Sequence, residues 1–331
     1  FMAFDGITVA CMAHELHKNL SGGRISKIAQ PETDELLLTI KSQEGNFRLL
    51  LSASASLPLV YLTQTNKPSP LTAPNFCMLL RKHISGGRII AVTQPSMERI
   101  LRFEIEHLDE MGDQCRKFLI VELMGKYSNI IFCNEQDQII DSIKHISAQV
   151  SSVREVLPGR PYFIPDTFTL TEEDFVRRVT EKFCKLSKAL YTSITGLSPI
   201  ASEEICHLAS LDSDRPATSY DPEELIHLYR TFGRYLDPVR EGGYEPSIYY
   251  EGKVPVEFSC LPLSIYDNCR CEHFPTVSSM LEQYYAERNM VTRIRQKSTD
   301  LRRIVQTALE RNIKKYDLQA KQLKDTEKRE K

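Results

Sequence analysis

Hydrophobic and polar positions follow the same order twice in the first 135 residues of the chain. Apolar residues at helical spacing predict two helices, at residues 12–19 and 76–83, and a Gly pair after each one supplies its end. Runs rich in apolar and β-branched residues follow each helix and predict strands, at residues 34–40, 47–53, 99–105 and 117–124. We therefore predict two units, residues 2–66 and 67–135, each with a helix, a Gly-Gly turn and three strands.

A repeated phrase marks the same point in both units. LSGGRISKIAQP at residues 20–31 and ISGGRIIAVTQP at residues 84–95 share seven of twelve letters. Neither unit can bury the apolar face of its strands alone, which favours packing of the two units against each other. We expect a pseudo-twofold pair of small sheets.

The pattern becomes helical after a Pro-rich linker. Residues 156–166 hold three prolines and a glycine, which predicts an extended segment on the surface. Apolar residues at spacings of three and four then predict a helix over residues 171–194. Gly196 ends it, Pro199 begins the second helix of a tight hairpin, and a third helix follows from Asp221.

The last part of the chain combines a hairpin with one long helix. Residues 247–263 predict a β-hairpin around Gly252. After Pro275 there is no Gly or Pro for 56 residues. Apolar residues there step by four and three, as in a coiled-coil seam, at Leu309, Ile313, Tyr316, Ala320 and Leu323. The sequence stops inside this helix, so we expect the returning arm of the coiled coil to lie outside it.

These patterns together predict an α+β fold in four parts. They are an N-terminal domain that contains the repeat and the linker, a helix-hairpin-helix region, a β-hairpin segment and the first arm of a truncated coiled coil, at residues 2–166, 167–240, 241–275 and 276–331. The N-terminal domain is expected to hold the two small sheets.

Charge is distributed unevenly along the chain. The net charge is −2, but residues 278–331 hold 14 Lys/Arg against 8 Asp/Glu. A basic arm on an acidic body is an electrostatic footprint for RNA. No apolar run is long enough for a membrane span, and the N-terminus lacks the secretory pattern. The nine cysteines, among them Cys77 and Cys133 in apolar runs, are expected to be reduced thiols in the cytoplasm.

Motifs of catalysis and metal binding are missing or wrongly spaced. The sequence has no GxGxxG, Walker or GxSxG motif. HELHK places His14 and His17 three residues apart, whereas a zinc-protease helix needs a spacing of four. CRCEH groups Cys269, Cys271 and His273 without a second ligand pair, and we expect it to be a solvent-edge loop. We therefore expect no metal and no cofactor.

The Gly-Gly-Arg turns leave two interpretations open. Each can be a plain helix-to-strand turn. Alternatively, converging backbone N–H groups and a following arginine, Arg24 or Arg88, can hold a phosphate.

The two copies differ just past the second QP. Glu98-Arg99 in the second copy aligns with Asp34-Glu35 in the first, so only the second copy places an acid beside a guanidinium. Such a pair can be a surface ion pair of little consequence. It can also be a recognition element, in which the acid accepts from a base or ribose and the arginine grips phosphate or a guanine edge.

Six motifs in the right order resemble the NFACT family, its bacterial branch in particular. They are FDGI at 4–7, LSGGRISKI at 20–28, FCMLLRKHISGG at 76–87, VELMGKYSNIIF at 121–132, DSIKH at 141–145 and LPGRPY at 157–162. The resemblance implies an N-terminal domain similar to that of the formamidopyrimidine-DNA glycosylases, then a helix-hairpin-helix region and a coiled-coil arm.

The resemblance also implies a function in ribosome-associated quality control. Bacterial members of the family bind a large ribosomal subunit that is obstructed by peptidyl-tRNA and recruit alanyl-tRNA for template-free addition of an alanine tail. The ribosome itself makes the peptide bond. This implies a protein that binds tRNA and is not an enzyme.

The family's functional residues map onto five positions here. Glu98 and Arg99 match its acid-arginine pair, although bacterial relatives usually have Asp where this chain has Glu98. Glu122-Leu123 match a second functional segment, and Asp5 in FDG matches a further acid. To these we add basic residues beside the motifs as candidates for tRNA binding: Arg24, Lys27, Arg81, Lys82 and Lys126. The first copy is then expected to be scaffold, and the second to read the tRNA.

Two other functions compete with this interpretation. A DNA glycosylase would need an N-terminal proline nucleophile, but Ala3 and Phe4 follow Met2. A surface adhesin that binds fibronectin or fibrinogen would need export, which the absent signal and the many unpaired cysteines oppose. Fibronectin stays a possible secondary partner.

Overall fold

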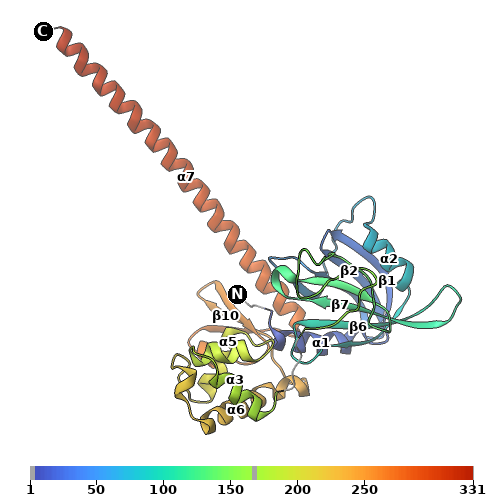
Figure 1. The fold of residues 1–331 in the computed structure, drawn as a ribbon. Helices are drawn as coiled ribbons and strands as arrows, with labels where there is room; N and C mark the ends of the chain where they lie inside the picture. The colour runs from blue at the N-terminus through green and yellow to red at the C-terminus, as the bar shows by residue number, and fades with distance from the viewer. Residues whose placement is uncertain (1–3, 166–169, 331) are drawn as a thin grey trace.

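The computed structural model describes residues 4–165 and 170–330 and confirms the α+β class. A large antiparallel sheet with two helices forms one part of the body, and a bundle of helices lies beside it (Figure 1). The last helix projects far beyond both parts.

The repeat consists of two copies of a helix followed by strands. The first copy holds α1 (Gly6–Leu20), β1 (Arg24–Glu32), β2 (Glu35–Ser42), β3 (Gly45–Ser52) and β4 (Leu59–Thr63). The second holds α2 (Asn75–Ile84), β5 (Arg88–Thr93), β6 (Ile100–Leu108), β7 (Gln114–Glu122) and β8 (Asn129–Cys133), and β9 (Ile139–Ser142) extends it. Each copy has four strands rather than the expected three, because β4 and β8 pair with β3 and β7.

The two expected sheets meet edge to edge and form one nine-stranded sheet, in the order β4-β3-β2-β1-β5-β6-β7-β8-β9. Four backbone hydrogen bonds make the join: Gly22 N–H to Ile89 O (2.7 Å), Gly86 N–H to Ile25 O (2.8 Å), Ile25 N–H to Gly87 O (2.9 Å) and Ile89 N–H to Gly23 O (2.9 Å). Each bond has a counterpart with the two copies exchanged. The repeated phrase therefore pairs with itself across a pseudo-twofold axis beside Arg24 and Arg88.

Each helix packs on the first strand of the other copy. His17 on α1 accepts a hydrogen bond at Nδ1 from the Val92 amide of β5 (3.2 Å), and Arg81 on α2 donates Nε–H to the Ile28 carbonyl of β1 (2.9 Å). These contacts are equivalent, because both pairs are related by the repeat offset. The apolar faces of both helices belong to one core with both halves of the sheet. Neither copy can therefore complete its core without the other.

The join excludes the phosphate-nest interpretation of the Gly-Gly-Arg turns. The Gly22 and Gly86 amides donate across the join, and those of Gly23 and Gly87 donate to the last turn of the preceding helices (2.9 and 3.0 Å). With all four N–H groups used, no anion nest remains. The plain-turn interpretation is the right one, and Arg24 itself donates to the Gly86 carbonyl (3.2 Å).

The Pro-rich linker is more buried than the sequence suggested. Val156 and Tyr162 are buried in a second apolar cluster on the outer face of the second half-sheet, with Ile120 and Ile131. A backbone bridge from Val156 to Ile146 fixes the start of the segment. The segment lies on the surface as predicted, and Val156 and Tyr162 anchor it to this face of the sheet.

The helical region holds α3 (Glu172–Thr180), α4 (Leu186–Ser193), α5 (Pro199–Leu208) and α6 (Pro222–Glu241). The single helix predicted over residues 171–194 is wrong, because the Cys184 carbonyl and the Leu186 amide bond to the backbone of residues 215–217 and interrupt it. The predicted ends are confirmed: Gly196 has φ +80°, and Asp221 caps α6 in a capping box.

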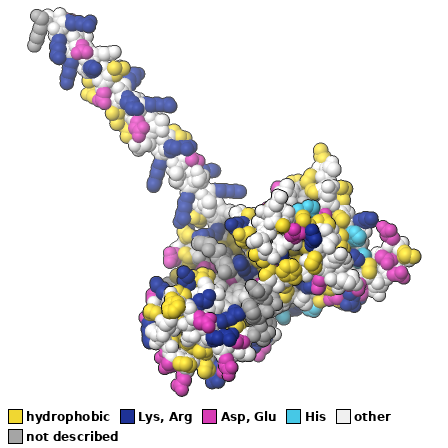
Figure 2. Space-filling view, in the orientation of Figure 1, with side chains coloured by type: hydrophobic (Ala, Val, Ile, Leu, Met, Phe, Trp, Pro, Cys, Tyr) yellow, Lys and Arg dark blue, Asp and Glu magenta, His cyan; other side chains and the backbone are white. Residues whose placement is uncertain are grey.

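The predicted hairpin, β10 (Ser247–Glu251) and β11 (Val254–Ser259), is confirmed and gains a third strand. That strand, β12 (Arg270–His273), is formed by CRCEH, which we expected to be a loop; it pairs with β10. The long helix α7 (Val277–Arg329) follows. Most of its surface is exposed, with Lys/Arg side chains and apolar residues interspersed along it (Figure 2).

Glu15 of the HELHK motif fastens α7 to α1. Its carboxylate accepts the backbone N–H groups of Val277 (2.7 Å) and Ser278 (3.1 Å) and the Ser278 hydroxyl (2.6 Å). A negative charge at the free N–H groups of a helix start is favourable.

Within residues 4–165 and 170–330, none of the helices combines the length and hydropathy needed to cross a bilayer. The same residues contain no group of three or more His, Cys, Asp or Glu side chains arranged to hold a metal ion.

The join predicts an asymmetry between two glycines. A Cβ on Gly23 would lie 2.8 Å from the Ile40 side chain and 2.9 Å from the Leu20 carbonyl, whereas one on Gly233 in α6 would meet nothing within 4 Å. We expect Gly23→Ala to lower the free energy of unfolding by about 1–3 kcal/mol. Gly233→Ala should raise it by about 0.5–1 kcal/mol. Urea unfolding measures both, and equal effects would contradict the close packing of Gly23 against Leu20 and Ile40.

Candidate functional site

The turn between β5 and β6 carries Glu98 and Arg99 and is tied to the start of α1. The Gln94 side-chain amide donates to the carbonyls of Gly6 and Glu98, both at 2.8 Å. The Glu98 amide donates to the Pro95 carbonyl (3.0 Å) and closes the turn. The turn is therefore held both internally and against α1.

Two glycines enclose the carbonyl of Met97 in this turn. The Gly6 amide donates to the Gly196 carbonyl (2.6 Å), which joins α1 to the α4–α5 hairpin. A Cβ on Gly6 would lie 2.2 Å from the Met97 oxygen, and one on Gly196 would lie 1.9 Å from it. Only glycine fits at either position, so three chain segments meet here at backbone distance.

Asp5 caps α1 beside this junction. Its Oδ1 accepts the Thr8 amide (2.9 Å) and the Thr8 hydroxyl (3.1 Å), as an N-cap aspartate does. Burial raises the pKa of the Asp5 carboxyl, and hydrogen bonds from Thr8 and Ser198 partly oppose the shift. Asp5 therefore orders the helix start that holds the turn.

Glu98 is buried and Arg99 is half-buried at the entry to β6. Burial raises the pKa of Glu98; Arg99 lowers it in part, and Glu122 adds to the rise. Burial also lowers the pKa of Arg99, against the carboxylates of Asp5 and Glu98. Among the described residues, no carboxylate lies within the 4.0 Å ion-pair distance of the Arg99 guanidinium. Its charge is held near acids but not neutralised by direct contact.

Glu122 and Leu123 lie beside Arg99 and are buried. Glu122, 1% exposed, forms a short ion pair with Arg154 and accepts the Tyr162 hydroxyl (3.0 Å), so it anchors the Pro-rich segment. The Leu123 amide donates to the Arg99 carbonyl (2.9 Å). Both residues are placed to position Arg99, and Glu122 itself does not line the cavity described below.

The added basic residues separate into two places. Lys126 is exposed next to the site, on the short helix η1 (Gly125–Tyr127), with its amine 5.0 Å from the Tyr127 ring centroid. Arg24, Lys27, Arg81 and Lys82 lie on β1 and α2 instead. Arg24 pairs with Arg88, at the far end of β5 from the turn, about 17 Å along the strand. The structure does not bring these four together with Arg99.

The first copy has no equivalent site at its own turn. Glu35, which aligns with Arg99, is buried and forms an ion pair with Lys67 (2.8 Å). The side-chain amide of Gln30, the counterpart of Gln94, donates to the Thr33 carbonyl of its own turn (3.1 Å). Its side-chain oxygen Oε1 is buried and has no hydrogen-bond partner within the described part of the chain. The two copies therefore differ at this turn both in sequence and in side-chain contacts.

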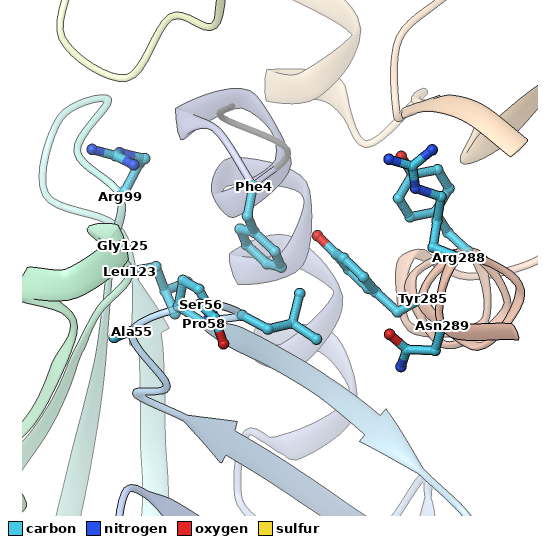
Figure 3. Close-up of a pocket in the computed structure, with 12 residues that line it drawn as sticks. Phe4, Ala55, Ser56, Pro58, Arg99, Leu123, Gly125, Tyr285, Arg288 and Asn289 are labelled. Carbon is cyan, nitrogen blue, oxygen red and sulfur yellow. The ribbon is translucent and has the colours of Figure 1, made fainter. Parts of the chain in front are cut away.

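A cavity of about 330 Å³ opens beside Arg99 (Figure 3). Arg99 and Leu123 line one wall, Phe4 lies in the middle, and Tyr285 and Arg288 of α7 stand opposite. The sequence analysis missed the α7 residues, because it treated residues 276–331 as a separate arm. A tyrosine pair at positions 284 and 285, three residues before an arginine, was the only signal.

Glu257 on β11 is a further acid near the cap of α1. Among the described residues, its carboxylate accepts a hydrogen bond from the neighbouring Phe258 amide alone (3.2 Å). Burial, with a smaller contribution from Asp5, raises the pKa of Glu257 from 4.5 to about 7. The negative form of Glu257 is thus poorly supported in the folded chain.

The enclosure of the Met97 carbonyl by Gly6 and Gly196 predicts that one added methyl group lowers stability strongly. Gly196 and Gly159 both have positive φ (+80° and +85°), but a Cβ on Gly159 would meet nothing within 4 Å. Gly159→Ala should cost about 1 kcal/mol from backbone strain alone. Gly196→Ala should cost at least about 2 kcal/mol more, because its Cβ overlaps a backbone oxygen. Thermal unfolding measures both losses of stability. Equal losses would contradict the close packing of Gly196 against the Met97 carbonyl.

Glu257 predicts a pH dependence of stability. Because its folded-state pKa lies above its unfolded value of 4.5, folding favours the protonated form, and stability falls as pH rises from about 4.5 to about 7. We expect Glu257→Gln to gain about 2 kcal/mol over the parent at pH 8 and almost nothing at pH 4. Urea unfolding across this range is the measurement, with Glu251→Gln, at an exposed position, as control. A gain independent of pH would show that Glu257 is not the titrating group.

Comparison with known proteins places this arrangement in a family. The family described as "NFACT N-terminal and middle domains" matches residues 5–331. The Rqc2 homolog RqcH of Bacillus subtilis (strain 168) is 33% identical over 334 residues, which cover 98% of this chain and 56% of that protein. The ribosome quality control complex subunit 2 of Saccharomyces cerevisiae is 26% identical over 191 residues, 57% of this chain and 17% of that protein.

A solved structure agrees with the sequence relatives. The N-terminal part of the fibronectin/fibrinogen-binding protein from Streptococcus suis has a TM-score of 0.68 and 31% identity, and the match covers 86% of this chain and 99% of that one. The chain spans about half the length of the bacterial RqcH proteins it matches. By sequence and by structure, this chain belongs to the NFACT family.

Proposed function

We propose that this chain holds tRNA in a ribosome-associated quality control factor. The factor binds a large ribosomal subunit obstructed by peptidyl-tRNA in the cytoplasm, recruits alanyl-tRNA and so allows template-free alanine tailing. The chain contributes binding and orientation, and the ribosome forms each peptide bond. The family relation to RqcH and to the yeast quality control subunit supports this role.

The observation that carries the proposal is that the Arg99 guanidinium has no direct counter-ion among the described residues. It lies on a turn held by three chain segments, next to a buried acid, yet no described carboxylate neutralises it at ion-pair distance. A preorganised cation with this surrounding suits an external phosphate or guanine edge, and Glu98 suits a base or ribose donor. Exposed Lys126 and Tyr127 beside it add a basic and an aromatic contact for RNA.

An RNA census tests the proposal. The natural protein is purified from its own cells and the co-purified RNA is sequenced, with Glu98→Ala plus Arg99→Ala as the variant. We expect large-subunit RNA in both samples and one dominant tRNA, an alanine tRNA, that falls at least about ten-fold in the variant, because charge-assisted contacts are lost.

The first copy supplies the matched control. Asp34→Ala plus Glu35→Ala changes the aligned positions and should leave the tRNA at the parental level, once unfolding curves show that the variant is folded. Equal losses in both variants would refute recognition by the second copy. Absence of RNA enrichment in every sample would refute the quality control role itself.

The similarity to the fibronectin/fibrinogen-binding protein of Streptococcus suis supports a second candidate, an adhesin for fibronectin or fibrinogen. Protease shaving of intact cells separates the two. Loss of the protein from intact cells would favour adhesion, and protection until lysis would favour the ribosomal role.

A further inference from the structure

The start of α7 is fixed relative to the site. Glu15 binds its first N–H groups, and the Ser278 hydroxyl accepts the Leu62 amide of β4 (2.9 Å). Tyr285 and Arg288 follow within about three turns of this anchor. Because they are three residues apart, they lie on the same face of the helix. Their place opposite Arg99 is therefore set by the fold.

The cavity between them has the chemistry of a nucleotide site. Arg99 and Arg288 reach it from different walls, and Phe4 and Tyr285 lie between the two guanidinium groups in the view of Figure 3. None of the described residues that line it is acidic. Two cations without a lining acid favour an anion, and aromatic faces favour a flat base.

Arg288 has charge to offer. Its Nη1 makes a long hydrogen bond to the Pro255 carbonyl (3.4 Å), and its guanidinium lies 6.0 Å from the Tyr284 ring centroid. Within the described part of the chain, no carboxylate is within ion-pair distance of it. Like Arg99, it lies near an acid, here Glu257, but no described carboxylate is in direct contact with it.

The size of the cavity narrows the ligand. At about 330 Å³ it suits one small group and is far too small for a duplex. A base can enter it only when it is unpaired and turned out of its stack, as in RNA loops and single strands.

We propose that α7 completes the RNA site, with one unstacked nucleotide held between Arg99 and Arg288 and its base against Phe4 and Tyr285. This rests on the proposed tRNA function and assigns the second wall of its site. The arm is thereby part of the recognition surface as well as an extension of the body.

Binding of bulk deacylated tRNA to this chain, measured by filter retention, tests the proposal. Arg288→Ala should weaken binding about ten-fold, because a charge-assisted contact is lost. Arg293→Ala removes the same charge from α7 without a cavity contact and should change binding by less than about two-fold. Equal effects of the two variants would overturn the assignment to Arg288.

A second pair of variants separates stacking from folding. Tyr285→Phe keeps the ring and should bind like the parent, whereas Tyr285→Leu should bind about ten-fold more weakly. A 2-aminopurine-labelled single-stranded RNA octamer should lose fluorescence on binding to the parent, and this quenching should be absent with Tyr285→Leu at saturating protein. Unchanged quenching would overturn the stacking role.

The outcomes distinguish this inference from the function on which it rests. If Glu98→Ala plus Arg99→Ala weakens tRNA binding and Arg288→Ala does not, the proposed function stands and the second wall is refuted. If the parent chain retains no tRNA under any condition tested, both are refuted.

Discussion

The four backbone hydrogen bonds between the Gly-Gly-Arg turns are the constraint on which the rest of the molecule depends. They place β1 and β5 side by side and so force each helix to pack on the first strand of the other copy. A helix that must cover a neighbour's strand cannot fold with its own unit alone. The repeated phrase is thus retained for geometry, since both copies must present the same carbonyls and amides at the join.

Symmetry at the join makes the asymmetry elsewhere informative. Both helices end at the same point of the repeat, at Leu20 and Ile84, but α1 has fifteen residues and α2 has ten. The additional residues lie at the start of α1, where Gly6 and Asp5 meet the β5–β6 turn of the second copy. The shorter α2 leaves the β1–β2 turn of the first copy without such a neighbour. There Lys67 neutralises the carboxylate of Glu35. A difference in helix length therefore accounts for the different surroundings of Arg99 in the second copy and Glu35 in the first.

The sequence predicted the repeat and both helix ends, because each depends on local letters. It singled out Glu98-Arg99 through the resemblance, and the binding role of this pair stays a prediction. It did not predict the single sheet, since strand pairing across the join involves residues 64 positions apart. It also missed the break after α3, where backbone bonds from residues 215–217 override a good helical pattern. For Glu122 the role is anchoring Arg154 and Tyr162, which no local pattern could show. The place of Tyr285 and Arg288 beside Arg99 was missed for the same reason, because contacts with α1 and β4, distant in sequence, position the start of α7.

One helix connects the site to the arm. Asp5 caps α1 beside the β5–β6 turn, and Glu15, ten residues later and about 15 Å along the same helix, binds the start of α7. Between these two points lies an uninterrupted helix whose inner face is fully buried, so no hinge separates them. If the proposed function holds, such a link is favourable, because ordering a flexible joint would cost free energy at every binding event. The buried charges at the site carry a desolvation cost of their own. In return, the β5–β6 turn and the start of α7 are held in a fixed position relative to each other, because both are bound to α1.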